Sequence, residues 1–286
     1  MEKSITLLRR KRVDKSYWRG TQIDILLGLN FIKNKGKRTK KNNRLEGVNN
    51  ETGNFVMFGE PEITSEYTFD QVVQNTHIYF NFNNGLLTSP INFSSKLKRC
   101  LEDYEKGIKI PRFGVIPVFL VGQQFTFAHS NILIFDFKNK TCERFEPYGY
   151  SSEDKDFDKK MTKVLAVFKL KYQKPLKDAD FQESEEHQIS VSAKTAKKIS
   201  SDPGGYCAAW CIWYVQLRLK FPKLTREQLI DKINKELKKL ETSERTLIRN
   251  YANYLIRARG KILEDKGLGK ERSKFSRIEQ LQTLYN

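Results

Sequence analysis

Three apolar segments in the middle of the chain, separated by only a few residues each, constrain the fold more than any other feature. They cover residues 114–121, 126–137 and 142–145, and short polar segments at 122–124 and 139–140 divide them. Apolar runs of this length with turn residues between them are typical of neighbouring antiparallel strands. We therefore expect the core sheet here, with a hairpin turn at 139–140.

Helical patterns follow this region. Residues 207–219 would be apolar on nearly every face of a helix, which predicts a buried helix. Residues 154–171 repeat apolar residues at three- and four-residue intervals, which predicts an amphipathic helix. Other elements are less strongly marked. We expect helices at 94–107, 225–240 (capped by Thr225), 243–263 and 278–285, strands at 77–82 and 188–192, a turn at 83–85, a loop at 51–61, and a strand or short helix at each apolar cluster of 4–28.

Composition indicates a folded and strongly basic protein. The 286 residues are 38% hydrophobic and 12% aromatic, with a net charge of +18 at pH 7, enough apolar material for one large domain or two ordinary ones. Positive charge is concentrated in 1–48 and 217–286. It predicts contact with nucleic acid or another polyanion, without distinguishing DNA, RNA, an acidic partner or an anionic membrane. The strongest basic run, expected to be a solvated loop or an anion-binding arm, contains Lys33, Lys35, Lys37, Arg38, Lys40 and Lys41.

Several classes of protein are excluded by the sequence. No stretch approaches the roughly 18 to 20 apolar residues of a membrane span, and the N-terminus lacks the apolar core of a secretory signal, so we expect an intracellular protein. Four cysteines are too few for a disulfide scaffold, and their spacing matches no zinc pattern, so we expect free thiols and no metal site.

One cysteine and one histidine lie where nucleophilic catalysis needs them. A thiol nucleophile requires a histidine to take and return its proton and a third group to orient the imidazole. Cys207 opens the predicted buried helix, where the positive helix end and free amides would lower the pKa of its thiol and supply part of an oxyanion site. His129 lies in the second predicted strand and Glu146 ends the third. With a turn at 139–140, paired positions sum to about 277 to 280, which places Glu146 two to five residues from the position opposite His129.

The segment from Asn139 to Gly149, with its Phe-Glu-Pro-Tyr-Gly, resembles the segment that carries the acidic triad member in adenain-like cysteine proteases, and the Gly-Tyr-Cys at 205–207 resembles their nucleophile site. The family also includes Ulp1-like enzymes and maturation proteases of large DNA viruses. The resemblance covers about 114–221. It implies an α+β fold in which a small mixed sheet packs on a buried helix bearing the nucleophile, with C-terminal helices added. It also implies Cys207 as nucleophile, His129 as base, Glu146 as orienting acid, and no metal or organic cofactor.

Two positions depart from the family pattern. The family usually has a Trp directly after the histidine, where this chain has Ser130, and a Gln six or seven residues before the cysteine, where this chain has serines. Our oxyanion candidates are therefore Ser200, Ser201 and Asp202. Gly204 and Gly205 indicate a narrow substrate channel, and the family often prefers glycine near the scissile bond.

Other residues are candidates for the same roles. Asp136 and Asp202 are alternatives to Glu146, and Asn131 is a weaker one, because it shares a strand face with His129 and points the same way. We expect the remaining histidines and cysteines to be structural; these are His77, His187, Cys100, Cys142 and Cys211.

The resemblance favours a cysteine endopeptidase that matures viral polyproteins or structural proteins, in a virion or in host cytoplasm. Alternatives are removal of ubiquitin or a ubiquitin-like protein, acetyl transfer from acetyl-CoA as in YopJ-like enzymes, and nucleic-acid binding by a degenerate protease fold without activity. We expect a basic N-terminal segment at 1–48, a protease core at 49–222 and a basic helical extension at 223–286.

Overall fold

The computed structural model describes residues 22–38, 55–59, 69–122, 129–149, 154–179, 181, 206–239 and 244–265. Several sequence predictions lie outside these residues. They are the strand at 188–192, the helix at 278–285, and the candidates Lys40, Lys41, His187, Ser200, Ser201, Asp202, Gly204 and Gly205.

Helices and strands are interspersed along the described chain. The helices are α1 (Gln22–Arg38), α2 (Phe69–Thr76), α3 (Phe93–Glu105), α4 (Lys155–Ala166), α6 (Tyr206–Lys220), α7 (Arg226–Lys239) and α8 (Glu244–Asp265), with a 3-10 turn η2 (Lys177–Ala179). The strands are β1 (Val56–Met57), β2 (Ile78–Asn81), β3 (Leu86–Thr88), β4 (Phe113–Val121), β5 (His129–Asp136), β6 (Thr141–Phe145) and β7 (Lys171–Gln173).

The strands form one mixed sheet in the order β3-β2-β4-β5-β6-β7, and β1 pairs with β4. The three apolar segments that predicted the core sheet are β4, β5 and β6, and they are antiparallel neighbours. Parallel pairing of β1 and β2 with β4, and of β7 with β6, makes the sheet mixed. Phe135 pairs with Cys142, a register sum of 277, and Lys140 in the turn has a φ of 52°. The predicted hairpin is therefore confirmed.

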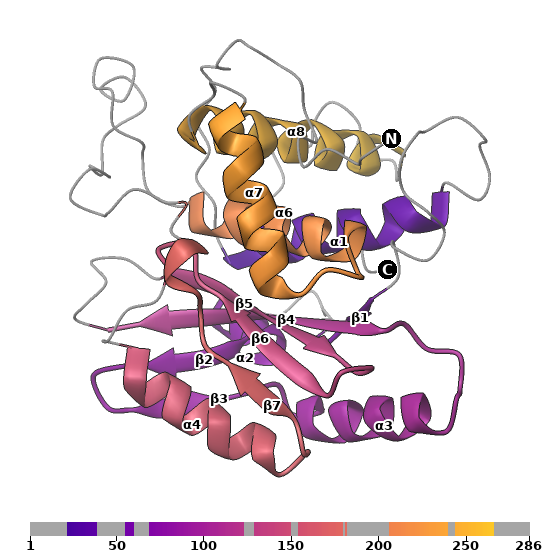
Figure 1. Ribbon diagram of the computed structural model, residues 1–286, viewed down its shortest axis with the longest axis vertical. Helices are drawn as coiled ribbons and strands as arrows, with labels where there is room; N and C mark the ends of the chain where they lie inside the picture. Colours follow the sequence, from indigo (N-terminus) through magenta and orange to yellow (C-terminus); the bar gives the residue numbers. More distant parts are fainter. Residues whose placement is uncertain are drawn as a thin grey trace.

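Both faces of the sheet are covered by helices, as Figure 1 shows, with α3 and α4 on one side and α1, α6, α7 and α8 on the other. Alternate residues of β5 divide between two hydrophobic clusters because successive strand side chains point to opposite faces. Ile132 and Ile134 join the cluster of α1, α6 and α8, whereas Leu133 and Phe135 join the cluster of α3 and α4. The protein is thus α+β.

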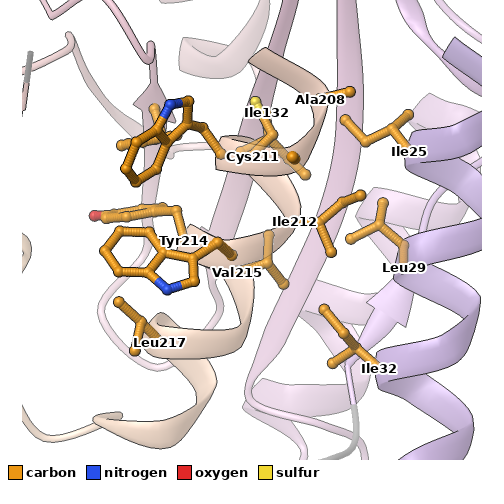
Figure 2. Packing of buried hydrophobic residues seen from close by; sticks show 14 of the residues in the cluster. Ile25, Leu29, Ile32, Ile132, Ala208, Cys211, Ile212, Tyr214, Val215 and Leu217 are labelled. Atoms are coloured by element: carbon orange, nitrogen blue, oxygen red, sulfur yellow. The ribbon is translucent and has the colours of Figure 1, made fainter. Parts of the chain in front are cut away.

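Helix α6 lies at the centre of the larger cluster. Every side chain from Tyr206 to Leu219 is buried, as its apolar sequence predicts. The helix packs against β5, α1 and α8. Figure 2 shows Ile212 directed toward Ile25 and Leu29 of α1, with Tyr214 and Leu217 on the opposite side of α6. Helix α6 is therefore held by the sheet and by two other helices.

Adjacent charged residues of β6 point to opposite faces of the sheet. Glu143 accepts hydrogen bonds from Arg218 Nε (2.9 Å) and the Tyr214 hydroxyl (3.4 Å) on α6. Arg144, fully buried on the other face, donates to Asp154 just before α4, and its Nη1 lies 3.7 Å from Asp158 Oδ1. Strand β6 is thereby joined to α6 by one ion pair and to α4 by another.

The other expected elements are largely confirmed, including the 77–82 strand, the helices α3, α4, α7 and α8, and the Thr225 cap. The Thr225 hydroxyl accepts from the Gln228 amide (3.2 Å), while the Gln228 side chain accepts from the Thr225 amide (2.9 Å).

Four features differ from the predictions. The basic run is helical through Arg38, at the end of α1 where cations are favoured, and so is not a loop there. Strand β1 lies within the expected 51–61 loop, and α2 was not predicted. Residues 154–171 divide into α4 and the start of β7, since Lys169 adopts a left-handed φ of 56° that stops the helix.

Helix α1 belongs to the same hydrophobic cluster as α6 and α8, so the described parts of the predicted basic ends pack on the core. The boundaries at 48 and 222 stay predictions. No helix in the described parts of the chain combines the length and apolar character needed to cross a bilayer.

Candidate active site

Cys207 is the second residue of α6. Its side chain is 6% exposed. The amide groups of a helix's first turn have no partner within the helix, and the positive end of the helix dipole points the same way. A thiolate at this position is therefore stabilised, and an oxyanion formed beside it would lie near amide groups that have no partner inside the helix.

His129 opens β5 beside this helix and connects Cys207 to Glu146. Its Nε2 donates to Glu146 Oε1 at 2.6 Å. A second hydrogen bond joins the imidazole to Cys207, and because Nε2 faces Glu146, Nδ1 is the ring atom left for the thiol. Both His129 and Glu146 are 3% exposed, so water screens neither contact. The three residues form a continuous chain of hydrogen bonds from thiol to carboxylate.

The carboxylate of Glu146 receives two more donors. The Tyr148 backbone amide donates to Oε1 (3.0 Å), and Asn131 Nδ2 donates to Oε2 (2.6 Å). Burial raises the pKa of Glu146, but the positive charge and hydrogen bond of His129, the charge of Arg144 and the Tyr148 amide outweigh it, so this pKa lies below its usual value. Glu146 is ionised at neutral pH.

The histidine and the cysteine shift each other's protonation. Burial lowers the pKa of His129, but the charge of Glu146 and the hydrogen bonds to Cys207 and Glu146 hold that pKa well above its usual value. Burial raises the pKa of Cys207, but the hydrogen bond and charge of His129, with hydrogen bonds from Ser130, bring that pKa below its usual value. The two shifts together favour a thiolate and imidazolium pair.

Two neighbours of His129 shape its surroundings. The Tyr148 ring stacks on the imidazole, with centroids 4.9 Å apart and planes 29° from parallel. Ser130 hydrogen bonds to Cys207 through both its amide and its hydroxyl. Its carbonyl accepts from the Cys211 thiol at 3.4 Å, which ties the second turn of α6 to β5.

The alternative acids lie elsewhere or serve differently. Asp136 is at the far end of β5, where it pairs with Arg112 (2.5 Å). Asn131 shares the face of His129 as expected and contacts Glu146. The cysteines Cys100, Cys142 and Cys211 are free and buried, and burial raises the pKa of each thiol. His77 is buried beside Thr76, whose hydroxyl lies 2.7 Å from Nδ1.

The structure brings together His129, Glu146 and Cys207, and leaves the predicted basic candidates on a different element. Lys33 is half-buried in α1, and Lys35, Lys37 and Arg38 occupy the last turns of that helix. Polyanion contact at these residues stays a prediction.

Sequence reasoning missed the supporting contacts of Ser130, Tyr148 and Arg144. The register sum of 277 already places residue 148 opposite residue 129, so the stacked tyrosine could have been found from the hairpin alone. The contacts of Ser130 with α6 and of Arg144 with Asp154 carry no local signal, because each depends on how a separate helix packs.

No protein-family model matches the chain. Among curated proteins, the chain is 23% identical over 280 residues to the ankyrin repeat protein L371 of Acanthamoeba polyphaga mimivirus. The match covers 88% of this chain and 33% of that protein, so the chain spans about a third of the length of this relative.

Among solved structures, the chain is similar to two crystal structures of the Legionella pneumophila effector protein RavZ, with TM-scores of 0.40 and 0.34 and identities of 10% and 12%. These matches cover 93% and 94% of this chain, and 80% and 94% of the RavZ chains. Similarity at this level identifies neither a family nor a function.

Proposed function

We propose that the protein is a cysteine endopeptidase in which Cys207 is the nucleophile, His129 the general base and acid, and Glu146 the group that orients the imidazole. The observation that carries the proposal is the unbroken hydrogen-bond chain from Cys207 through His129 to Glu146 at the start of a buried helix. A cysteine buried only for packing, such as Cys211, has a raised thiol pKa, whereas that of Cys207 is lowered.

The reaction follows from these groups. The Cys207 thiolate attacks the carbonyl carbon of a peptide bond, and amides of the first turn of α6, which have no partner inside the helix, donate to the oxyanion. His129 gives its proton to the leaving amine, which departs and leaves a thioester on Cys207. His129 then takes a proton from water, the resulting hydroxide attacks the thioester carbonyl, and the thiolate is released with a carboxylic acid product.

For the substrate, we propose a viral polyprotein or structural protein cleaved near glycine. The similar mimivirus protein supports a viral setting, in which the enzyme would act in the virion or the host cytoplasm. The residues Gly204 and Gly205, just before the nucleophile, support a narrow channel that glycine fits.

The test is covalent labelling of the purified protein with a Gly-Gly peptide electrophile and with a ubiquitin C-terminal electrophile, each read by intact mass and peptide mapping. We expect one adduct, at Cys207, with the peptide probe. The variants Cys207→Ala and His129→Ala should not be labelled, whereas Cys211→Ala, one helical turn away, should be labelled like the wild type.

The outcomes separate the candidate functions. Preference for the ubiquitin probe would replace the polyprotein substrate by a ubiquitin-like conjugate. Absence of labelling by both probes would overturn the protease proposal, and acyl transfer from acetyl-CoA would be measured next.

A further inference from the structure

Asn131 occupies a position in β5 that packing alone does not explain. It lies two residues after His129 and is fully buried, on the face of the sheet that otherwise carries Leu133 and Phe135. Its Nδ2 donates to Glu146 Oε2 at 2.6 Å. The amide orientation is fixed by this contact, because a flipped side chain would set Oδ1 against a carboxylate oxygen at the same distance.

The contact completes the set of donors around Glu146. Oε1 receives His129 Nε2 and the Tyr148 amide, and Oε2 receives Asn131. A carboxylate held by donors on one oxygen alone can rotate about its last side-chain bond, which would move Oε1 away from the imidazole. A donor on Oε2 removes that freedom, so the direction of the His129 ring depends on Asn131.

The carbonyl oxygen of the Asn131 side chain lowers the stability of the fold. Among the described residues, Oδ1 is buried without a hydrogen-bond partner. An unsatisfied buried carbonyl destabilises a fold, and this loss offsets part of the stability that the hydrogen bond from Nδ2 to Glu146 contributes. Asparagine at this position therefore benefits the site more than the fold.

We propose that Asn131 is a positioning residue of the site, which locks the carboxylate of Glu146 so that His129 is held toward Cys207. This inference rests on the proposed orienting role of Glu146, and it assigns to Asn131 an effect on reactivity separate from its effect on stability.

The experiment is the rate of Cys207 alkylation by iodoacetamide as a function of pH, beside thermal unfolding, for the wild type, Asn131→Leu and Asn131→Asp. We expect Asn131→Leu to alkylate about tenfold more slowly at neutral pH, the loss of one charge-assisted hydrogen bond, and to lose stability because Glu146 Oε2 is left buried without its donor. Asn131→Asp keeps the shape but sets a second carboxylate against Glu146. The two carboxylates cannot both ionise so close together, so the pKa of the pair is raised and Glu146 is partly protonated at low pH. The acid limb of the alkylation-rate profile should therefore move to higher pH.

Asn253→Leu, which replaces another buried asparagine on α8, is the control and should alkylate like the wild type. Wild-type rates and pH profiles in both Asn131 variants would overturn the inference, as would a loss of stability with no change in profile. Should Asn131→Leu fail to fold, the profile of the isosteric Asn131→Asp decides alone. Alkylation reports the thiolate whether or not the protein cleaves peptides, so failure here is distinct from failure of the probe labelling.

Discussion

Ser130, directly after His129 in β5, contacts Cys207 through both its backbone and its side chain. Its amide and hydroxyl both hydrogen bond to Cys207, while the next residue in β5, Asn131, donates to Glu146. Three consecutive residues of β5 thus contribute to the site. His129 connects Cys207 to Glu146, Ser130 donates to Cys207, and Asn131 donates to Glu146.

The pH dependence of Cys207 alkylation should report this arrangement. Because the pKa of the thiol is lowered, the thiolate is already present below the pH at which an ordinary cysteine ionises, and the alkylation rate should reach its plateau at correspondingly lower pH. Ser130→Ala removes one donor to the thiolate, which raises the pKa of Cys207. We expect its rate profile to move to higher pH, with about a tenfold slower rate at pH 6.

Ser130→Thr keeps the hydroxyl and serves as the matched control. A profile of Ser130→Ala that coincides with the wild type would show that the Ser130 hydroxyl contributes nothing to thiolate formation.

At the scale of elements, helices α1 and α6 cross at close range. Gly28 of α1 faces Ile212, and a Cβ added at Gly28 would lie 2.4 Å from Ile212 Cδ1 and 3.0 Å from its Cγ1. Ile212 is itself fully buried and directed toward Ile25 and Leu29, so it has no free space into which to turn (Figure 2). The glycine allows the two helices to approach.

Gly28→Ala should therefore lower stability even though alanine is the better helix former. The gain in helix propensity is about 1 kcal/mol, and overpacking in a tight core costs about 1 to 3 kcal/mol, so we expect a net loss of about 1 kcal/mol in urea unfolding. Ile212→Val removes the Cδ1 atom, and in that background Gly28→Ala should be close to neutral. A stabilised Gly28→Ala single variant would contradict the crossing as described.

Elements that are determined by residues close together in the sequence can be predicted from it, whereas elements that are determined by packing between distant segments cannot. The β5–β6 hairpin follows from two apolar runs and one turn. The same pattern predicted that Glu146 lies near His129. The helical conformation of residues 33–38 in α1 was not predicted, because a run of charged residues like this resembles a loop. The helix is instead stabilised by Ile25, Leu29 and Ile32, which pack in the same cluster as α6. Strand β1 has two residues, too few to leave a pattern.

At the scale of the whole molecule, the first and the last helix of the described chain both pack against α6. Helices α1 and α8 pack against each other and against α6 (Figure 1). Asp24 pairs with Arg259 at 2.5 Å, and the rings of Phe31 and Tyr254 meet edge to face at 5.6 Å. The Tyr251 hydroxyl donates to Gln216 Oε1 of α6 at 2.8 Å. The C-terminal helices buttress the helix that carries Cys207.

Deletion of 244–286 should consequently abolish cooperative folding. It would expose the buried face of α6 that Tyr251, Ala252 and Leu255 cover, and circular dichroism on heating should show no sharp transition. Tyr251→Phe, which removes only the hydroxyl, should keep the transition and lose about 1 kcal/mol. A deletion variant that unfolds cooperatively would instead support the predicted 223–286 extension as a separate unit.

The opposite orientation of Glu143 and Arg144 has a consequence for insertions and deletions in the gene. Loss or gain of one codon in the 138–140 turn would shift β6 by one residue and exchange the two faces. A glutamate would then meet Asp154 and Asp158, and an arginine would meet Arg218. Since both exchanges bring like charges together in the core, this hairpin should tolerate substitutions in its turn far better than changes in its length.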